Sequence, residues 1–481
     1  MQGLTWTPLG TDAGITWVSP MPPVGSGNQT VTVEITNAQT ATINSLELSY
    51  TDGVSTVTET FGSLTLTAGN NQQFSFTTPY NLTGNASLRA YVSLVNGVLD
   101  DNQANDTTTI QNICPAMAGN YTINSAVVTG GTNFQSFTDA VNQLICSSVN
   151  GPVVFDVFPG SGPYNEQILI PEIGGASATN TISFNGNMET LAFASANTNQ
   201  RAVITLSGAD HISIDSLTIN ASGGTYGYGV HILSQADSNK ITNNVVTTTA
   251  NLTTTNFAGI VMSAALTSAT TAGNTGSGNE ISGNTINNGY YGITVVGTSA
   301  DPFISGNRIL NNTIVDHYLY GIYSLGNTGT EFIGNEIRHL SRTTFTTMYG
   351  VYLTTNTIGA QVIGNRIHDL FVGGTSSSTA YGIYVAGDAL LGTENKLINN
   401  LVYNFHGTGI HYGIYNTGGN HMWAWHNTIS FDNAAAASGT TYGIYKLQLR
   451  ILYSIIIITY QLHAVEQILD LEYSLIQLVH I

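Results

Sequence analysis

The C-terminal two thirds of the chain repeat one short phrase: an aromatic or small residue, then glycine, then a β-branched aliphatic residue. The phrase is most often Tyr-Gly-Ile-Tyr, and β-branched and aromatic residues fill the intervals with almost no helical pattern. A return every 29 to 33 residues predicts a solenoid built from β-strands. The repeated glycines are Gly229, Gly259, Gly292, Gly321, Gly350, Gly382, Gly413 and Gly443.

A second phrase, an asparagine followed two positions later by an aliphatic residue, lies between the glycine phrases. Asparagine tolerates the left-handed conformation needed at a corner, and its amide both donates and accepts hydrogen bonds. We therefore expect an internal asparagine ladder, with a ring of ligand-binding amides as the alternative. In the glycine phrase we expect glycine at a corner, the aliphatic residue inside and the following tyrosine outside. The asparagines are Asn244, Asn284, Asn312, Asn335, Asn365, Asn400 and Asn427.

The first hundred or so residues instead show short alternating segments separated by turn clusters, which predicts a β-sandwich. The expected strands are Thr30–Thr36, Thr42–Tyr50, Val54–Phe61, Gln73–Thr77 and Ser87–Leu94.

The closing segment Leu99–Thr107 of this part resembles the final strand region of the immunoglobulin-like adhesion domains called CARDB, found in bacterial cell-surface proteins. Its oxygen-bearing side chains Asp100, Asp101, Asn102 and Asp106 are hard ligands suited to Ca²⁺. The alternative interpretation is a polar turn rich in Asx residues.

Cys114 and Pro115 mark a boundary, and an amphipathic helix pattern follows, with Ser136 and Asp139 placed for an N-cap. We expect this helix to cover the open end of the solenoid. The two cysteines, Cys114 and Cys146, are compatible with one disulfide in an oxidising compartment, which would tie the helix to the interdomain segment. The apolar residues of the pattern are Phe134, Phe137, Ala140, Val141, Leu144 and Ile145.

Two stretches, Pro152–Ile170 and Ala202–Asn220, together with the repeats, resemble right-handed parallel β-helix proteins of the pectin-lyase-like superfamily, in the sub-group with parallel β-helix repeats. The resemblance covers about residues 120–445 and implies three parallel strands per coil, with coils about 4.8 Å apart. The expected fold is all-β: an N-terminal β-sandwich, then a right-handed three-sided parallel β-helix with an N-terminal capping helix.

The expected domains follow this division. They are an immunoglobulin-like, CARDB-like sandwich over 1–112, a linker and capping helix over 113–150, the β-helix over 151–445, and an aberrant tail over 446–481. That tail has no Gly, Asn or Pro, so we hypothesise a frame-shifted terminus, with a natural hydrophobic cap as the alternative. No signal peptide follows Met1, so we expect the sequence to begin inside a longer reading frame.

No segment has the length of a membrane-spanning helix.

The net charge of the chain limits the classes of partner that it can bind. The net charge is −18 with only ten Lys and Arg, which argues against nucleic acid because phosphate binding needs clustered basic residues. Calcium or uncharged glycans suit this surface better. We expect a secreted or cell-surface bacterial protein, a monomer, whose partner is a polysaccharide or another surface protein.

Strand alternation predicts an outward aromatic strip formed by the tyrosine that closes each glycine phrase. Stacked tyrosines can bind sugar rings or a protein through their faces. The alternative is a ladder that only stabilises its own sheet. Thr294 and His231 continue the column toward the N-terminus. The expected binding residues are Tyr323, Tyr352, Tyr384 and Tyr415, followed by Tyr445.

A polar column follows the asparagine phrase by four residues and contains the catalytic candidates Asp316, His339 and Asp369, with Asn288 and Asn404 at its ends. Two carboxylates two coils apart would be roughly 9 to 10 Å from each other, near the upper end of the spacing in an inverting glycosidase. The alternative is a charge-compensated surface ladder.

Motifs typical of related enzymes are missing. The β-helix region has no Gly-His-Gly, Asn-Thr-Asp or Asp-Asp, so no catalytic residue is carried over from the superfamily. We therefore expect a non-catalytic protein that presents a Tyr-rich face and needs no cofactor, Ca²⁺ aside. The alternatives are a polysaccharide lyase or glycoside hydrolase of the pectin-lyase-like type, and a structural spacer.

Overall fold

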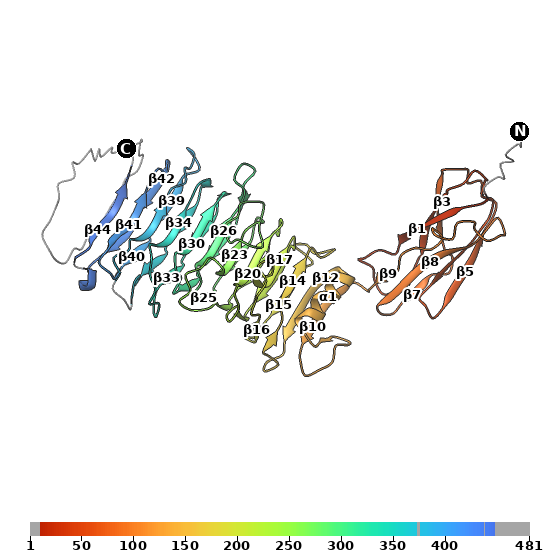
Figure 1. The fold of residues 1–481 in the computed structure, drawn as a ribbon, viewed down its shortest axis with the longest axis horizontal. Helices are drawn as coiled ribbons and strands as arrows, with labels where there is room; N and C mark the ends of the chain where they lie inside the picture. Colours follow the sequence, from red (N-terminus) through yellow and green to blue (C-terminus); the bar gives the residue numbers. More distant parts are fainter. Residues whose placement is uncertain (1–9, 373–375, 437, 448–481) are drawn as a thin grey trace, which may run out of the picture. The chain divides into compact units, whose positions relative to one another are not determined.

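The computed structural model describes residues 10–372, 376–436 and 438–447 (Figure 1). The chain divides into two compact units, residues 1–246 with 275–281 and residues 247–274 with 282–481. The division falls within the expected β-helix, and the expected domain boundaries near residues 112 and 150 remain predictions. Of the expected aberrant tail, all but Lys446 and Leu447 lies outside the described residues. No helix among the described residues is long and apolar enough to cross a membrane.

The first unit begins with an antiparallel β-sandwich, and the five strands expected there form within a few residues of their expected limits. One sheet has the order β1 (Ala13–Ser19), β3 (Thr32–Asn37) and β6 (Asn71–Ser75). The other has the order β5 (Thr56–Phe61), β4 (Leu46–Thr51), β8 (Ala86–Val95) and β9 (Gln111–Ile113). A short pair joins β2 (Gly27–Gln29) and β7 (Tyr80–Leu82).

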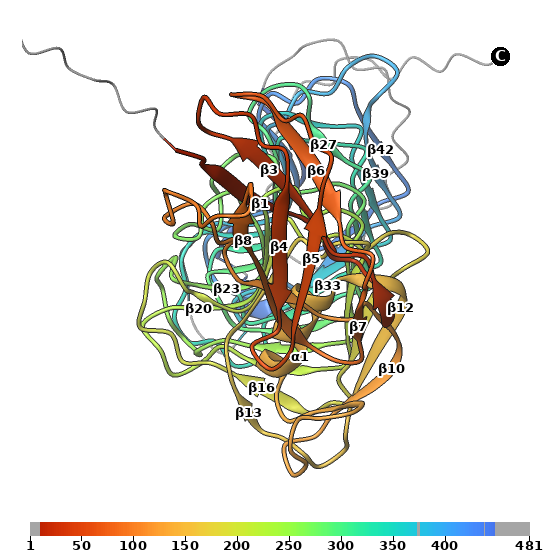
Figure 2. The same ribbon diagram turned by 90° about the vertical axis from the view of Figure 1, so that its right-hand side faces the viewer.

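Alternation along these strands explains the sandwich core. Ile35, Leu48 and Val92 are buried members of one apolar cluster to which both sheets contribute, while alternate positions such as Thr36 in β3 and Arg89 in β8 are exposed. In Figure 2 these strands face the viewer. The β-sandwich is confirmed, whereas its likeness to immunoglobulin-like CARDB domains remains a prediction.

Helix α1 (Phe137–Ser147) forms where the helical pattern predicts it. Ser136 is its N-cap, and the Ser136 side chain accepts a hydrogen bond from the Asp139 N–H at 3.0 Å. Phe137 is fully buried and packs edge-on against Tyr164, with ring centroids 5.1 Å apart. Only the role of this helix as a cap remains a prediction.

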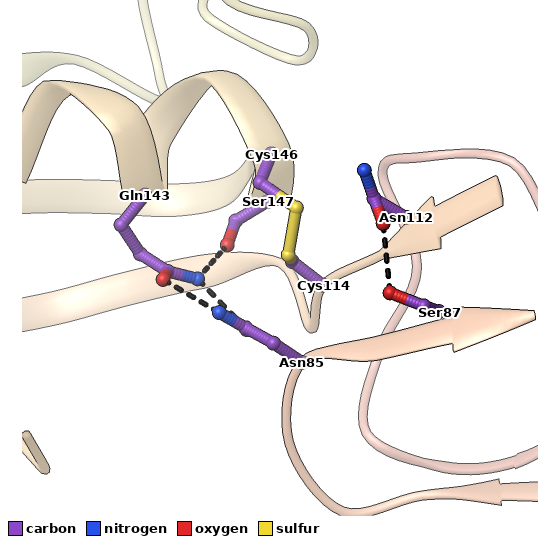
Figure 3. The surroundings of a disulfide bond; sticks show 7 residues. All are labelled: Asn85, Ser87, Asn112, Cys114, Gln143, Cys146 and Ser147. Atoms are coloured by element: carbon purple, nitrogen blue, oxygen red, sulfur yellow. Dashed lines mark hydrogen bonds between the residues drawn. A yellow bond between two sulfur atoms is a disulfide. The ribbon is translucent and has the colours of Figure 1, made fainter. Parts of the chain in front are cut away.

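A disulfide joins Cys114, just after β9, to Cys146 in the last turn of α1 (Figure 3). Beside it, the side-chain amides of Asn85 and Gln143 exchange two hydrogen bonds of 2.9 and 3.0 Å. The disulfide therefore links the segment after β9 to α1, and the amide pair links the turn before β8 to the same helix.

We predict that replacing both cysteines by serine (C114S with C146S) lowers the free energy of unfolding of the first unit by about 3 to 4 kcal/mol. The bridge closes a loop with a sequence separation of 32, and an uncrosslinked unfolded chain gains that much conformational entropy. Guanidinium denaturation of both proteins, with and without reductant, measures the effect. Reductant should change only the wild type, and equal midpoints for the two oxidised proteins would contradict the prediction.

After the sandwich, the first unit contains coils of a three-sided parallel β-helix, each side being a parallel sheet. The first side consists of β11 (Asn133–Phe134), β10 (Met117–Ile123), β12 (Val149–Val157), β15 (Ile182–Asn185), β18 (Ile212–Asp215) and β21 (Lys240–Thr242). The second consists of β13 (Tyr164–Asn165), β16 (Thr190–Ala192) and β19 (Thr218–Asn220). The third consists of β14 (Ile168–Pro171), β17 (Ala202–Ser207) and β20 (Gly227–Leu233).

The second unit has the same three-sided parallel arrangement. Its first side consists of β28 (Arg308–Leu310), β32 (Glu331–Ile333), β36 (Gln361–Ile363), β39 (Asn395–Ile398) and β42 (Met422–Trp425). Its second consists of β25 (Thr285–Asn287), β29 (Thr313–Val315), β33 (Glu336–Arg338), β37 (Arg366–His368), β40 (Leu401–Tyr403) and β43 (Thr428–Ser430).

The third side of the second unit, here called the tyrosine sheet, runs from green to blue in Figure 1. It consists of β23 (Phe257–Met262), β26 (Tyr291–Val296), β30 (Tyr320–Leu325), β34 (Met348–Leu353), β38 (Ala380–Val385), β41 (Ile410–Asn416) and β44 (Thr440–Lys446). A further short sheet joins β27 (Ile304–Ser305), β31 (Asn327–Thr328) and β35 (Thr357–Ile358), and η1 (Ala434–Ala436) is a 3₁₀ turn. Two short strands, β22 (Val245–Thr247) and β24 (Glu280–Ser282), contain residues of both units. The three-sided parallel β-helix is confirmed.

Buried asparagines link successive coils of the second unit. The backbone N–H and the side-chain Nδ2 of Asn335 both donate to Oδ1 of Asn365, each at 2.9 Å. Asn365 donates in the same way to Asn400, and Asn400 to Asn427. Because every amide in this run has partners within the protein, the asparagines form the expected internal ladder.

Candidate functional site

The glycine of the repeated phrase lies inside a strand, and the expectation of a corner glycine is wrong. Gly321 is the second residue of β30 and is buried. A Cβ atom on Gly321 would lie 2.6 Å from the Gly350 carbonyl oxygen and 2.7 Å from Cγ2 of Ile337. Only glycine fits, because the core and the next coil occupy the space of a side chain. The same contacts recur at Gly292, Gly350, Gly382 and Gly413.

This glycine changes which side chains reach the surface. In β30, Gly321 and Ile322 are both buried in succession, while Tyr320 and Tyr323 are both half-buried. Strict alternation would send the two tyrosines to opposite faces. The pairing between β30 and β34 joins Tyr320 to Tyr349 and Ile322 to Val351, passing over the glycine. Both tyrosines of each phrase therefore share the outer face of the tyrosine sheet.

A tyrosine column missed by the sequence analysis runs along the first position of the phrase. Its neighbouring rings stack nearly parallel, with interplanar angles of 5° to 20° and centroids 4.9 to 5.5 Å apart. Because neighbouring rings cover one another's faces, the column exposes mainly ring edges and hydroxyl groups. The signal in the sequence is the i, i+3 spacing of tyrosines around glycine. The members are Tyr291, Tyr320, Tyr349, Tyr381, Tyr412 and Tyr442.

The expected binding residues form the second column beside it. Tyr323, Tyr352, Tyr384 and Tyr415 pair coil to coil and continue to Tyr445. Here two successive contacts are edge-to-face, with centroids 5.7 Å apart for Tyr323 and Tyr352 and 4.7 Å apart for Tyr352 and Tyr384. Tyr352 also stacks nearly parallel on Tyr320 and Tyr349 of the first column, whereas Tyr384 meets Tyr349 and Tyr381 edge-to-face.

The outward strip does not continue as expected toward the N-terminus. Thr294, which pairs with Tyr323, is completely buried, and His231 is buried as well.

Burial and neighbouring tyrosines raise the pKa of Tyr349 and of Tyr352 to about 12. These hydroxyls therefore stay protonated and uncharged at neutral pH. We call the two tyrosine columns together the tyrosine face.

We predict that Gly350→Ala lowers the free energy of unfolding of the second unit by about 1 to 3 kcal/mol and disturbs the tyrosine face. The new Cβ would lie 2.6 Å from both the Gly382 carbonyl oxygen and Cγ2 of Ile367. Gly418→Ala is the matched control, because no atom lies within 4 Å of the Cβ position there and φ is ordinary. Urea denaturation and near-ultraviolet circular dichroism measure the two effects, and equal stability of both variants would contradict the packing role.

The catalytic candidate Asp316 is a buried residue that anchors a loop. Its carboxylate accepts hydrogen bonds from the N–H groups of Leu340 and Ser341 at 2.7 and 3.1 Å, and from the Ser341 hydroxyl at 2.7 Å. Burial opposes ionisation, but these hydrogen bonds lower the pKa of Asp316 below its ordinary value. The carboxylate is thus ionised and already occupied by the loop after β33.

His339 lies one coil further along and is completely buried. Its ring is 4.9 Å from that of His317, also fully buried, and stacks on Phe345. Burial, together with the nearby Arg342 guanidinium, lowers the pKa of His339 to about 3, and burial lowers that of His317 as well. The histidine is therefore neutral and inside the coil, where it cannot exchange protons with a bound polymer.

Asp369, by contrast, belongs to a partly exposed polar cluster. His368 lies between two carboxylates, with Nδ1 2.6 Å from Asp369 Oδ2 and Nε2 3.1 Å from Glu336 Oε1. Arg338 pairs with Glu336 at 3.1 Å, and His406 lies 3.8 Å from Asp369. The structure thus brings Asp369 together with histidines other than His339. Each carboxylate in the cluster already has basic partners.

We predict that stability of the second unit falls as the pH drops from about 6.5 toward 3. A histidine whose pKa is lowered in the folded state contributes stability above the unfolded value of about 6.5, and loses it as the pH falls toward the folded value, here about 3 for His339. Urea denaturation from pH 7 to pH 4 should give a steeper decline for the wild type than for His339→Gln. Equal slopes would contradict this account. Both carry the same carboxylates, so those titrations cancel in the comparison.

Of the calcium candidates, Asp100 and Asp106 are buried in the sandwich next to Asp12, while Asp101 is exposed. Burial, with the neighbouring Asp100 carboxylate, raises the pKa of Asp106 to about 6. Within the described ranges, no group of three or more His, Cys, Asp or Glu side chains could hold a metal ion.

Residues 261–445 match a protein-family model described as periplasmic copper-binding protein (NosD). No curated protein matches the sequence. The likeness to NosD covers much of the tyrosine face and the asparagine ladder, and it agrees with the parallel β-helix of that region.

Among solved structures, a DFA-IIIase variant from Arthrobacter chlorophenolicus is 14% identical with a TM-score of 0.38, covering 66% of this chain and 86% of its own. The A-module of a mannuronan C-5 epimerase from Azotobacter vinelandii is 13% identical with a TM-score of 0.31, covering 70% and 87%. A family 28 exopolygalacturonase from Yersinia enterocolitica is 9% identical with a TM-score of 0.27, covering 92% and 98%. Likenesses this low carry no argument about function.

Copper does not fit the described residues. Proteins hold copper with imidazole, thiolate or thioether groups. Both cysteines are in the disulfide, and among the residues that the structure describes no group of three or more His, Cys, Asp or Glu side chains could hold a metal ion. The paired imidazoles of His317 and His339 also lie near the positive charge of Arg342, which opposes a cation.

Proposed function

We propose that this protein is a non-catalytic β-helix that binds an uncharged glycan chain along the tyrosine face. The observation that carries the proposal is the pair of half-buried tyrosine columns side by side on successive coils. The tyrosine face repeats ring edges and hydroxyl groups on each coil. Such a repeating surface suits a polymer whose own units repeat. Tyrosine combines a large apolar contact area with one polar group at low entropic cost.

Charge favours a neutral ligand. The tyrosine hydroxyls stay uncharged at neutral pH, and the chain carries a net charge of −18, which repels acidic polymers. A protein partner is the competing occupant, because tyrosines are also frequent in the energetic centres of protein interfaces.

Location outside the cytoplasm is part of the proposal. The disulfide between Cys114 and Cys146 persists in oxidising compartments, and the matching family description names periplasmic proteins. We infer a periplasmic, secreted or cell-surface protein on these two grounds.

An enzymatic role is the weaker proposal. Asp316 is engaged by a loop and His339 is buried, so a polysaccharide lyase or hydrolase would have to use Asp369 with its partners Glu336, His368 and His406. A general acid or base needs a free proton site facing the substrate. In this cluster both carboxylates are compensated, which is typical of a stabilised surface.

The test is a glycan array followed by calorimetry on the polysaccharide retained most strongly. Tyr352→Ala and Tyr384→Ala should each weaken binding about tenfold or more, since loss of one central aromatic contact costs at least about 1.4 kcal/mol. Tyr403→Ala, on another sheet, is the matched control and should keep wild-type affinity.

Three results would contradict the proposal. They are absence of binding to any uncharged glycan, unchanged affinity in the two tyrosine variants, and release of reducing ends or unsaturated products during incubation. The last result would support the enzymatic role, and Asp369→Asn would then be the variant to compare.

A further inference from the structure

The sandwich contains an acidic cluster that its own hydrogen bonds do not neutralise. Asp12, Asp100 and Asp106 are 4%, 5% and 7% exposed, and none of the ion pairs in the described part of the chain includes them. Buried carboxylates this close together repel one another strongly unless a proton or a cation lies between them.

Two of the acids are fixed by donors from the surrounding loops. Asp100 Oδ2 accepts from the Ala13 N–H at 2.6 Å, and Asp100 Oδ1 accepts from the Asn102 N–H at 2.9 Å. The Asp12 oxygens accept from the side-chain amides of Asn102 and Asn105 at 3.2 and 2.9 Å. These hydrogen bonds hold the segment around Asn102 against the start of β1.

Two buried oxygens in the same segment have no donor. They are Asp106 Oδ1 and Asn105 Oδ1, from adjacent residues, and each atom is shielded from solvent. The Asp106 side chain is more than nine-tenths buried and lies against Asp100, so its unpaired oxygen belongs to the cluster. A buried oxygen atom without a donor needs another partner, which can be a shared proton, a water molecule or a cation.

We propose that a single Ca²⁺ ion binds here, held by the carboxylates of Asp100 and Asp106 and the amide oxygen of Asn105. Calcium takes six to eight oxygen ligands in irregular geometry and accepts carboxylate, amide and backbone oxygens together. The described residues offer no set of three His, Cys, Asp or Glu side chains that could hold a metal alone. The proposed site therefore combines two carboxylates with the Asn105 amide oxygen and needs further oxygen ligands from the backbone or from water. Exposed Asp101, expected among the ligands, is replaced by Asn105.

The ion would stabilise the packing of the sandwich strands around the site. Asp100 and Asn102 contact Ala13 and Asp12 at the start of β1, and the Asp106 carbonyl accepts from the Val92 N–H of β8 at 2.8 Å. A cation at this point would therefore link the start of β1 and strand β8 to the segment between β8 and β9.

The experiment uses the full chain after chelation, with isothermal titration of CaCl₂ at pH 7.5 and thermal unfolding with and without the ion. We expect one bound Ca²⁺ and a rise of about 5 °C in the lowest unfolding transition. Asp106→Asn should lose the Ca²⁺ response yet unfold at a higher temperature than the calcium-free wild type, because it removes one buried repelling charge. Asp101→Asn, at the neighbouring exposed position, should respond to Ca²⁺ like the wild type.

Misfolding cannot explain a variant that loses the Ca²⁺ response and also unfolds at a higher temperature. A misfolded Asp106→Asn protein would unfold at a lower temperature than the calcium-free wild type. The proposal is overturned if the wild type shows no Ca²⁺ binding and is instead stabilised when the pH falls from 7.5 to 5, which identifies a shared proton. Equal responses to Mg²⁺ and Ca²⁺ would overturn the assignment to calcium. Loss of the response in Asp101→Asn would overturn the assignment of ligands.

Discussion

Register between successive coils is the constraint on which the β-helix depends. Each strand pairs with the strand one coil later, so a residue type at one position of the repeat stacks on its own copy, as Ile322 does on Val351. The asparagine ladder fixes that register, since the N–H and Nδ2 of Asn335 share the Oδ1 of Asn365. A slip of one residue would leave buried amides without partners, at a cost of about 1 to 3 kcal/mol each.

The repeated glycine determines which side chains of the β-helix reach the surface. Gly321 lets two consecutive residues face inward, so both flanking tyrosines, Tyr320 and Tyr323, lie on the outer face. The same packing that closes the core therefore produces a surface of twice the expected width. The double column of tyrosines is therefore a consequence of core packing.

Three ionisable residues at equivalent positions of the repeat have three different environments. Asp316 and His339 occupy equivalent corner positions on neighbouring coils, yet one is an ionised loop anchor and the other a neutral core residue. Asp369, at the next copy, joins a partly exposed network with the buried His368. Position in the repeat made all three look alike, whereas the loops of 340–346 and the ring of Phe345 decided which was covered.

The sequence by itself determined the sandwich strands, helix α1, a repeating β-solenoid and the inward asparagines, because periodicity and helix capping depend on residues that are neighbours in the chain. The three parallel strands per coil were implied by the resemblance to known β-helix proteins. It could not determine the place of the repeated glycine, since strict alternation puts Tyr320 on the wrong face. It could not show that His339 is buried or that Asp106 lies beside Asp100. Those facts depend on how far a loop folds over a coil and on which distant strands meet, and only the tertiary structure decides them.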